Sequence, residues 1–170
     1  MTIDLVFDAM MFAREVHKDQ VRKYTGNPYS DHLAEVAGIV STVLPYYPEM
    51  GQVMLACAWL HDCVEDQNVT GFFLRNRFGR DVATGVMHLS DLEQGNRAER
   101  KQASRDRLMM APSWVQTVKC ADLISNTSSI VQHDPKFAKV YLEEKRLLLD
   151  VLTLADDRLR SIAYEQAGAV

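Results

Sequence analysis

The sequence predicts an all-α fold, a compact bundle of roughly eight helices in a single domain that spans residues 1–170. Apolar residues recur at helical spacing along almost the whole chain, and sustained alternation of apolar and polar residues, the mark of a strand, is nearly absent. Glycine and proline interrupt these periodic segments at intervals that suit single helices. With 47% hydrophobic and 25% charged residues, the chain has the composition of one soluble domain with a proper core.

The first three helices are bounded by turn and capping residues. A helix is predicted over residues 4–18, before the GNP at 26–28 breaks the chain. Asp31 is expected to cap a second helix that continues to about Leu44, because Pro45 cannot extend it. A third helix is predicted from Gly51 to Glu65.

Two shorter helices and a charged one follow. Thr70 is expected to cap a helix that stops at Gly79, and Asp81 to open the next. The GN pair at 95–96 separates that helix from the charged segment RAERKQASRDRL, which is also expected to be helical.

The last part of the chain predicts two long helices. Ser113 and Gln116 match a capping box for a helix over residues 114–131. The DP pair at 134–135 ends it, and a final helix is expected from Lys136 to Arg160. Its apolar segment LLLDVLTL at 147–154 is expected to complete the core rather than to form a dimer face, which leaves homo-oligomerisation open.

Charge and cysteine content predict a cytoplasmic protein. The net charge of −4 argues against a nucleic-acid partner, since phosphate backbones are bound by clustered lysine and arginine. Asp4 and Asp8 interrupt the apolar N-terminal segment, which is expected to be neither a signal peptide nor a membrane span. Cys57, Cys63 and Cys120 are odd in number and lie in apolar segments, so reduced thiols are expected.

The segment WLHDCVED at 59–66 concentrates charge at the end of an apolar run. His61, Asp62, Glu65 and Asp66 follow VMLACA directly, and solvated charge runs do not usually terminate a wholly apolar helix. On a helix of about 3.6 residues per turn, the pairs His61–Glu65 and Asp62–Asp66 would share one broad face. A surface His–Asp pair would be the ordinary explanation of the dipeptide alone, but it does not account for the whole segment.

Two further polar groups suit the same site. Asp122 and Asn126 are four apart in KCADLISN, and His32 lies in the first turn of its predicted helix. Carboxylates buried in one core cost several kcal/mol unless they are paired or bind a metal, so their convergence suggests a cation. Imidazole and carboxylate ligands suit Mn²⁺, Fe²⁺, Co²⁺ or Zn²⁺ at a site with open positions.

These residues carry a family resemblance. His32, then His61 with Asp62, then Asp122 resembles the H…HD…D pattern of the HD superfamily of metal-dependent phosphohydrolases. The segments RKYTGNPYSDHLAEVAGI, WLHDCVEDQNVT and VKCADLISN are similar to the hydrolase domain of RelA/SpoT homologues, especially the small alarmone hydrolases. The similarity covers about residues 4–150 and implies a helical bundle of HD-domain type.

The resemblance also implies roles for individual residues. It assigns His32, His61, Asp62 and Asp122 as ligands of a metal, usually Mn²⁺. It assigns Glu65 and Asp66 to the attacking water, Asn126 to the reacting phosphate, and the substrate contacts to Arg22, Lys23 and Tyr141. Two positions depart from the family pattern: Leu33 replaces a common proline, and Ser128 replaces an arginine that would contact phosphate or base. The segment LEQGNRAERKQASRDRL differs as well, so the substrate could have diverged.

The resulting hypothesis is hydrolysis of the 3′-pyrophosphate of guanosine tetra- or pentaphosphate, with a small nucleotide as substrate and no membrane partner. One alternative is another HD phosphohydrolase, acting on an adenosine alarmone, a deoxynucleoside triphosphate or a nucleoside 5′-monophosphate. A second alternative is a non-catalytic nucleotide-binding module, against which the paired Glu65 and Asp66 argue. No room is expected for a synthetase domain within 170 residues.

Overall fold

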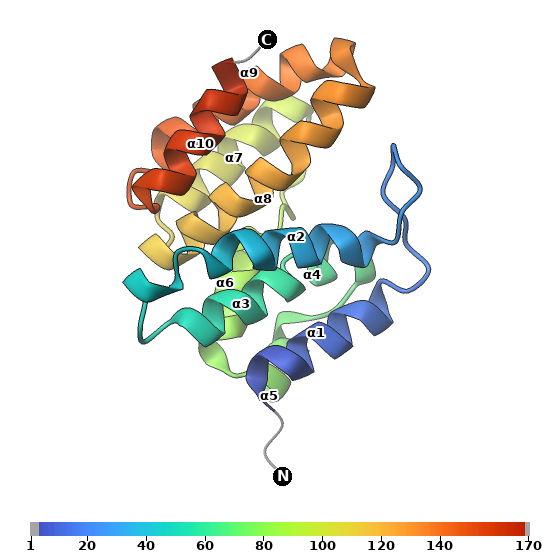
Figure 1. Ribbon diagram of the computed structural model, residues 1–170, viewed down its shortest axis with the longest axis vertical. Helices are drawn as coiled ribbons and strands as arrows, with labels where there is room; N and C mark the ends of the chain where they lie inside the picture. Colours follow the sequence, from blue (N-terminus) through green and yellow to red (C-terminus); the bar gives the residue numbers. More distant parts are fainter. Residues whose placement is uncertain (1–3, 169–170) are drawn as a thin grey trace. The chain divides into compact units, whose positions relative to one another are not determined.

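The computed structural model describes residues 4–168, which form ten α-helices and one 3₁₀ helix (Figure 1). The described residues contain no strand beyond the isolated bridge between Val21 and Pro28, so the all-α prediction is confirmed. The chain forms two compact units, Met1–Ser90 and Asp91–Val170. A single domain over the whole chain stays a prediction.

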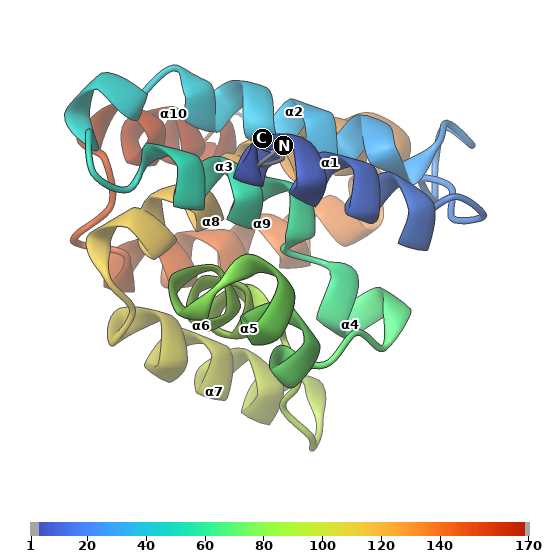
Figure 2. The same cartoon turned by 90° about the horizontal axis from the view of Figure 1, so that it is seen from below.

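The first unit is organised around a central apolar helix. Its elements are α1 (Leu5–Val16), α2 (Tyr29–Ser41), η1 (Leu44–Tyr46), α3 (Gly51–Leu60), α4 (Cys63–Gln67), α5 (Gly71–Phe78) and α6 (Arg80–Leu89). Helix α3 contacts α1, α2 and α6, and Figure 2 shows it between the α1–α2 pair and α6. Because α3 is apolar on nearly every side, it takes the central position, with Met54, Cys57 and Leu60 fully buried.

The predicted helix from Gly51 to Glu65 is interrupted. Helix α3 ends at Leu60, and Asp62 occupies the N-cap position of the short helix α4 with φ −99° and ψ −3°. The Nδ1 atom of His61 lies 2.8 Å from the carbonyl oxygen of Ala58, the acceptor that a regular helix would use for the amide of Asp62. The expectation that His61 and Glu65 are stacked on one continuous helix was therefore wrong.

Three other helix starts in this unit bear on the capping predictions. Thr70 caps α5 as predicted, since its hydroxyl accepts a hydrogen bond from the amide of Phe73. Gly79, with φ +91°, ends α5 and also precedes α6, so Asp81 lies in the first turn of α6 and does not cap it. Asp31 likewise lies in the first turn of α2, which begins after Pro28, and its predicted capping role was wrong.

The second unit consists of α7 (Arg97–Met109), α8 (Ser113–His133), α9 (Pro135–Val151) and α10 (Asp157–Gly168). Helix α8 contacts α9 and α10, and α9 contacts α7 and α10 (Figure 1). The GN pair precedes α7 as predicted, and Asn96 forms a capping box with Glu99. The predicted capping box at Ser113 was wrong. The buried Gln116 side chain instead donates to the carbonyl oxygens of Leu108 and Ala111.

The predicted final helix is divided at residues 152–156. The carboxylate of Asp156 accepts hydrogen bonds from the amides of Arg158 and Leu159, so it starts the new helix α10. The hydroxyl of Thr117 accepts from the amide of Asp156 and anchors this turn on α8. In the apolar segment at 147–154, Leu149 and Leu152 are buried, as expected for core residues, whereas Leu147 and Leu154 are exposed.

The three cysteines are buried and free, in agreement with the prediction of reduced thiols. Burial raises the pKa of each thiol, for Cys63 and Cys120 to about 12. Among residues 4–168, no helix has the length and apolar character needed to span a membrane.

Candidate functional site

Three predicted metal ligands converge in the first unit. His32 lies in the first turn of α2, and His61 and Asp62 form the junction between α3 and α4. The Nε2 atoms of the two histidines are 3.2 Å apart. Oδ2 of Asp62 lies 3.0 Å from Nε2 of His61 and 3.7 Å from Nε2 of His32. The interruption of the helix therefore brings two imidazoles and a carboxylate together inside the unit.

The hydrogen bond at the opposite edge of His61 prepares its ring to bind a metal. A carbonyl oxygen only accepts, so Nδ1 of His61 carries the proton that it shares with Ala58, and the Nε2 lone pair faces His32 and Asp62. Metal-binding histidines usually have this kind of second hydrogen bond. Donors bound to one cation at about 2.1 Å lie roughly 3 Å apart, close to the spacing seen here. These three residues thus fit a divalent cation.

Tyr29 and Gln20, neither of which the sequence had indicated, support this site. The hydroxyl of Tyr29 donates a 2.6 Å hydrogen bond to Oδ2 of Asp62. The side-chain amide of Gln20 donates to Oδ2 of Asp66 at 2.9 Å. His17 is 2% exposed, stacks on the ring of Tyr29 with centroids 5.2 Å apart, and contacts Gln20 through Nδ1.

The two carboxylates predicted to handle water lie on the exposed side of α4. Glu65 and Asp66 both belong to its first turn, and both are exposed. The predicted substrate contacts Arg22 and Lys23 lie in the segment before α2. Arg22 is partly buried, with a guanidinium nitrogen 4.0 Å from Glu35, and Lys23 is exposed with its ammonium over the ring of Tyr24.

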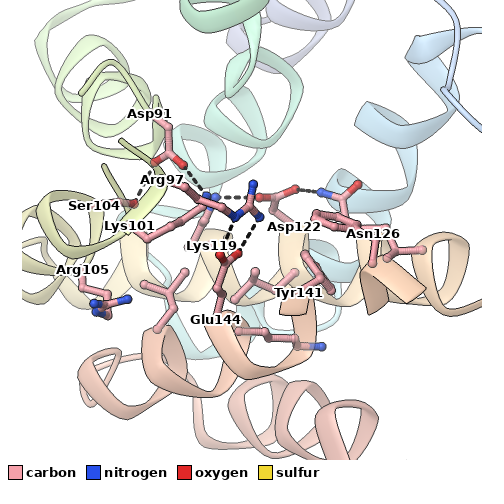
Figure 3. A pocket seen from close by; sticks show the side chains of 15 residues that line it. Asp91, Arg97, Lys101, Ser104, Arg105, Lys119, Asp122, Asn126, Tyr141 and Glu144 are labelled. Atoms are coloured by element: carbon pink, nitrogen blue, oxygen red, sulfur yellow. Dashed lines mark hydrogen bonds and ion pairs between the residues drawn. The ribbon is translucent and has the colours of Figure 1, made fainter. Parts of the chain in front are cut away.

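A cavity of about 350 Å³ lies in the second unit, and Figure 3 shows the side chains around it. Three predicted site residues line it: Asp122 and Asn126 from α8 and Tyr141 from α9. The lining residues also include an apolar group, Leu123, Ile130, Phe137 and Leu148, and five cations, Arg97, Lys101, Arg105, Lys119 and Lys145. Asp91, Asp122 and Glu144 supply three anionic groups, so the lining has a positive balance that suits an anionic ligand.

Asp122 lies at the centre of a hydrogen-bonded row along α8. Its Oδ2 accepts from Lys119 at 2.9 Å and its Oδ1 from Asn126 at 2.7 Å. Figure 3 shows the carboxylate between these two side chains. Lysine, aspartate and asparagine come from successive turns of one face of α8, which explains the spacing of the three residues in the sequence. The bonds to Lys119 and Asn126 fix the plane of the Asp122 carboxylate.

The opposite wall of the cavity combines aromatic and charged groups. Arg97 forms a two-point ion pair with Glu144, at 2.6 and 2.8 Å, and its guanidinium lies over the ring of Phe137. Burial raises the pKa of Tyr141 to about 12, so its hydroxyl is protonated at neutral pH.

Lys145 was not indicated by the sequence. It is 2% exposed and donates to Thr127 and Gln166, and burial lowers its pKa to about 8. The sequence does contain a signal for its burial. Lys145 has helical spacing from the buried residues Ala138, Leu142 and Leu149, so it lies on the apolar face of α9.

Comparisons with known proteins identify the family of this chain. The family model described as "HD domain" matches residues 9–146. The chain is 32% identical over 136 residues to guanosine-3′,5′-bis(diphosphate) 3′-pyrophosphohydrolase MESH1 of Xenopus tropicalis, covering 78% of this chain and 73% of that protein. It is 33% identical over 137 residues to the GTP pyrophosphokinase of Myxococcus xanthus, covering 75% of this chain but only 17% of that protein.

A solved structure described as "A metazoan ortholog of SpoT hydrolyzes ppGpp and plays a role in starvation responses" has the same fold. Its TM-score is 0.84 at 22% identity, and the match covers 98% of this chain and 95% of that one. The HD-type bundle expected from the sequence is therefore confirmed. The family match covers well over half of the chain and includes His32, His61, Asp62 and Asp122. This chain belongs to the HD domain family.

Proposed function

We propose that this protein is a metal-dependent hydrolase that removes pyrophosphate from the 3′ position of guanosine tetra- or pentaphosphate. Water adds to the phosphorus that is bonded to the ribose 3′ oxygen, the bond between them breaks, and the products are pyrophosphate and a nucleotide with a free 3′ hydroxyl. The relative from Xenopus tropicalis is named for this reaction. The cytoplasmic location expected from the sequence belongs to the same proposal.

One observation carries the proposal. His32, His61 and Asp62 converge, and the Nε2 lone pair of His61 faces the other two residues. We assign these residues and Asp122 as the ligands of one divalent cation, with Mn²⁺ as the expected ion. Asp122 enters this set through the family pattern and the chemistry of its carboxylate. When bound, such a cation lowers the pKa of a coordinated water and polarises a phosphate oxygen.

The remaining predicted residues take roles that suit their surroundings. Glu65 and Asp66 lie on the exposed side of α4, where they can accept and return the protons of the attacking water. Arg22 and Lys23 supply positive charge for the phosphates. Asn126 and Tyr141, together with the cations of the cavity, face the space proposed for the nucleotide. The volume of about 350 Å³ lies in the range of small-molecule sites.

Ser128 favours a second candidate substrate. Its hydroxyl donates to the carbonyl oxygen of Ser125 in the preceding turn of α8, so it does not replace the guanidinium common at this position in the family. Loss of that contact can relax selection of the base, which makes an adenosine 3′-pyrophosphate the alternative.

Product analysis distinguishes these substrates. The Mn²⁺-loaded protein would be incubated with guanosine and adenosine 3′-pyrophosphates, deoxynucleoside triphosphates and nucleoside monophosphates, with His61→Ala as the inactive control. Release of pyrophosphate from the guanosine 3′-pyrophosphates is the expected result. Turnover confined to triphosphates or monophosphates would overturn the substrate, and binding without turnover across the panel would indicate a nucleotide-binding module.

A further inference from the structure

We propose that Gln20 is a positioning residue that orients the carboxylate of Asp66 for its work on the attacking water. The inference rests on the proposed function, because it assigns a partner to one of the two water-handling carboxylates. It concerns a residue 46 positions away from Asp66 in the sequence, on the segment between α1 and α2.

The orientation of the Gln20 amide follows from its neighbours. A carboxylate only accepts hydrogen bonds, so the amide nitrogen must face Oδ2 of Asp66, at 2.9 Å. The amide oxygen then faces Nδ1 of His17 at 2.6 Å and the amide of Gln67. Both of these groups must donate to it, so His17 carries its proton on Nδ1. Three hydrogen bonds thus specify one orientation of the Gln20 side chain.

Ring contacts and a hydrogen bond hold the base of this network. His17 is 2% exposed and lies parallel to Tyr29, with an angle of 20° between the ring planes. Tyr29 is fixed in turn by its hydrogen bond to Asp62 and by an edge contact with His32. Gln20 therefore links the buried ring of His17 to a carboxylate on the surface.

The position of Asp66 in the fold explains why its side chain needs such support. It is exposed and belongs to α4, a helix of only five residues, so neither packing nor a long helix holds its side chain. Ordering a free side chain costs conformational entropy, and a bond formed before the substrate binds removes that cost from the reaction. The bond engages Oδ2 and leaves Oδ1 with no hydrogen bond to another described residue.

The main chain of Gln20 also closes the segment that carries the predicted substrate contacts. Its carbonyl oxygen accepts a 2.9 Å hydrogen bond from the amide of Tyr29. The neighbouring residues Val21 and Pro28 form an isolated β-bridge. Arg22 and Lys23 lie within this closed loop. The same residue thus supports both the water-handling carboxylate and the loop proposed to contact phosphate.

A double-mutant cycle tests the proposal. Gln20→Met keeps the length of the side chain and removes its hydrogen bonds, and Asp66→Asn removes the carboxylate. The proposal predicts that Gln20→Met lowers kcat by about 10- to 100-fold, with KM and Mn²⁺ affinity within about twofold of wild type. In the Asp66→Asn background the same change should have almost no further effect, because the two residues act as one unit. Gln52→Met, on the exposed side of α3, is the matched control.

The outcomes separate this inference from the proposed function. A wild-type protein that hydrolyses no member of the nucleotide panel overturns the proposed function, and this inference with it. An active wild type with an unaffected Gln20→Met, or with effects that add in the double mutant, overturns the role of Gln20 alone. If Gln20→Met lowers the melting temperature, His17→Phe provides a second measurement, since it keeps the ring and removes the Nδ1 donor. A fall in kcat that vanishes in the Asp66→Asn background is again expected, and an additive effect again contradicts the proposal.

Discussion

The hydroxyl of Tyr29 lies 2.6 Å from Oδ2 of Asp62 and donates a hydrogen bond to it. Tyr29 also contacts His32 edge-on, so one side chain touches two of the proposed metal ligands. It lies three residues before His32, which places both on one face of α2. The tyrosine therefore limits how the Asp62 carboxylate can rotate.

Replacing this hydroxyl should weaken metal binding. Tyr29→Phe keeps the ring contacts with His17 and His32 but frees Asp62 to rotate, and loss of such a hydrogen bond typically lowers metal affinity about 10- to 100-fold. Calorimetric titration with Mn²⁺ measures the effect. Tyr46→Phe, at a residue 67% exposed in the same unit, is the matched control. Equal Mn²⁺ affinity in the two variants would show that Tyr29 only packs against the site.

Metal binding should stabilise the fold through the proposed ligands. At a free Mn²⁺ concentration 100 times the dissociation constant, a ligand that binds only the native state adds about 2.7 kcal/mol. For a chain of this size each kcal/mol raises the melting temperature by roughly 2–4 °C. His61→Ala and Asp122→Asn should each lose most of that increase, whereas His133→Ala, on the exposed end of α8, should keep it. A full increase in Asp122→Asn would remove Asp122 from the ligand set.

Lys119 should strengthen the binding of the nucleotide and should not strengthen the binding of the metal. Its ammonium bonds Oδ2 of Asp122 and lines the cavity, where it can also meet a phosphate. A hydrogen bond to a charged group contributes about 1.5–3 kcal/mol, so Lys119→Met is expected to raise KM roughly 10- to 100-fold. Mn²⁺ affinity should stay equal or increase, since a positive charge beside a proposed ligand is removed. Steady-state kinetics compares it with Lys136→Met, which lies outside the cavity lining. A KM that does not change would exclude Lys119 from substrate binding.

Local signals predicted most of the fold. Thr70, Gly79 and the GN pair before α7 mark helix ends through their own side chains or backbone conformation, and the structure confirms each of them. The break after Leu60 was not predictable in this way. Apolar spacing continues through it, and the break accompanies a hydrogen bond from the His61 ring to the Ala58 carbonyl that competes with the helix. Likewise, Gln116 has the spacing of a capping residue. Its side-chain amide instead donates hydrogen bonds to the carbonyl oxygens of Leu108 and Ala111, which lie before α8.

The candidate site also contains residues that the local sequence marks and residues that only contacts between distant segments reveal. His61 and Asp62 were found because ionisable residues directly follow an apolar run, which a sequence displays openly. Gln20 and Tyr29 act through partners 46 and 33 residues away, and no local pattern marks a glutamine or a tyrosine that makes such contacts. These contacts exist only in the folded unit, where α1 and α2 pack against α3 and α1 contacts α4.

Lys145 predicts an unusual dependence of stability on pH. Burial lowers its pKa in the folded state to about 8 from an ordinary 10.5, so between these values the unfolded chain binds more protons than the native one. Below pH 8 the buried, charged ammonium therefore lowers the free energy of unfolding by its full amount. This loss of stability disappears as the pH rises toward 10.5. Lys145→Met lacks the effect. Urea denaturation at several pH values measures the free energy of unfolding of the wild type and of Lys145→Met. The difference, wild type minus variant, should increase between pH 8 and 10.5, by at most about 1.4 kcal/mol per pH unit. A difference that stays constant over this range would show that Lys145 titrates normally and that its ammonium is solvated in the native protein.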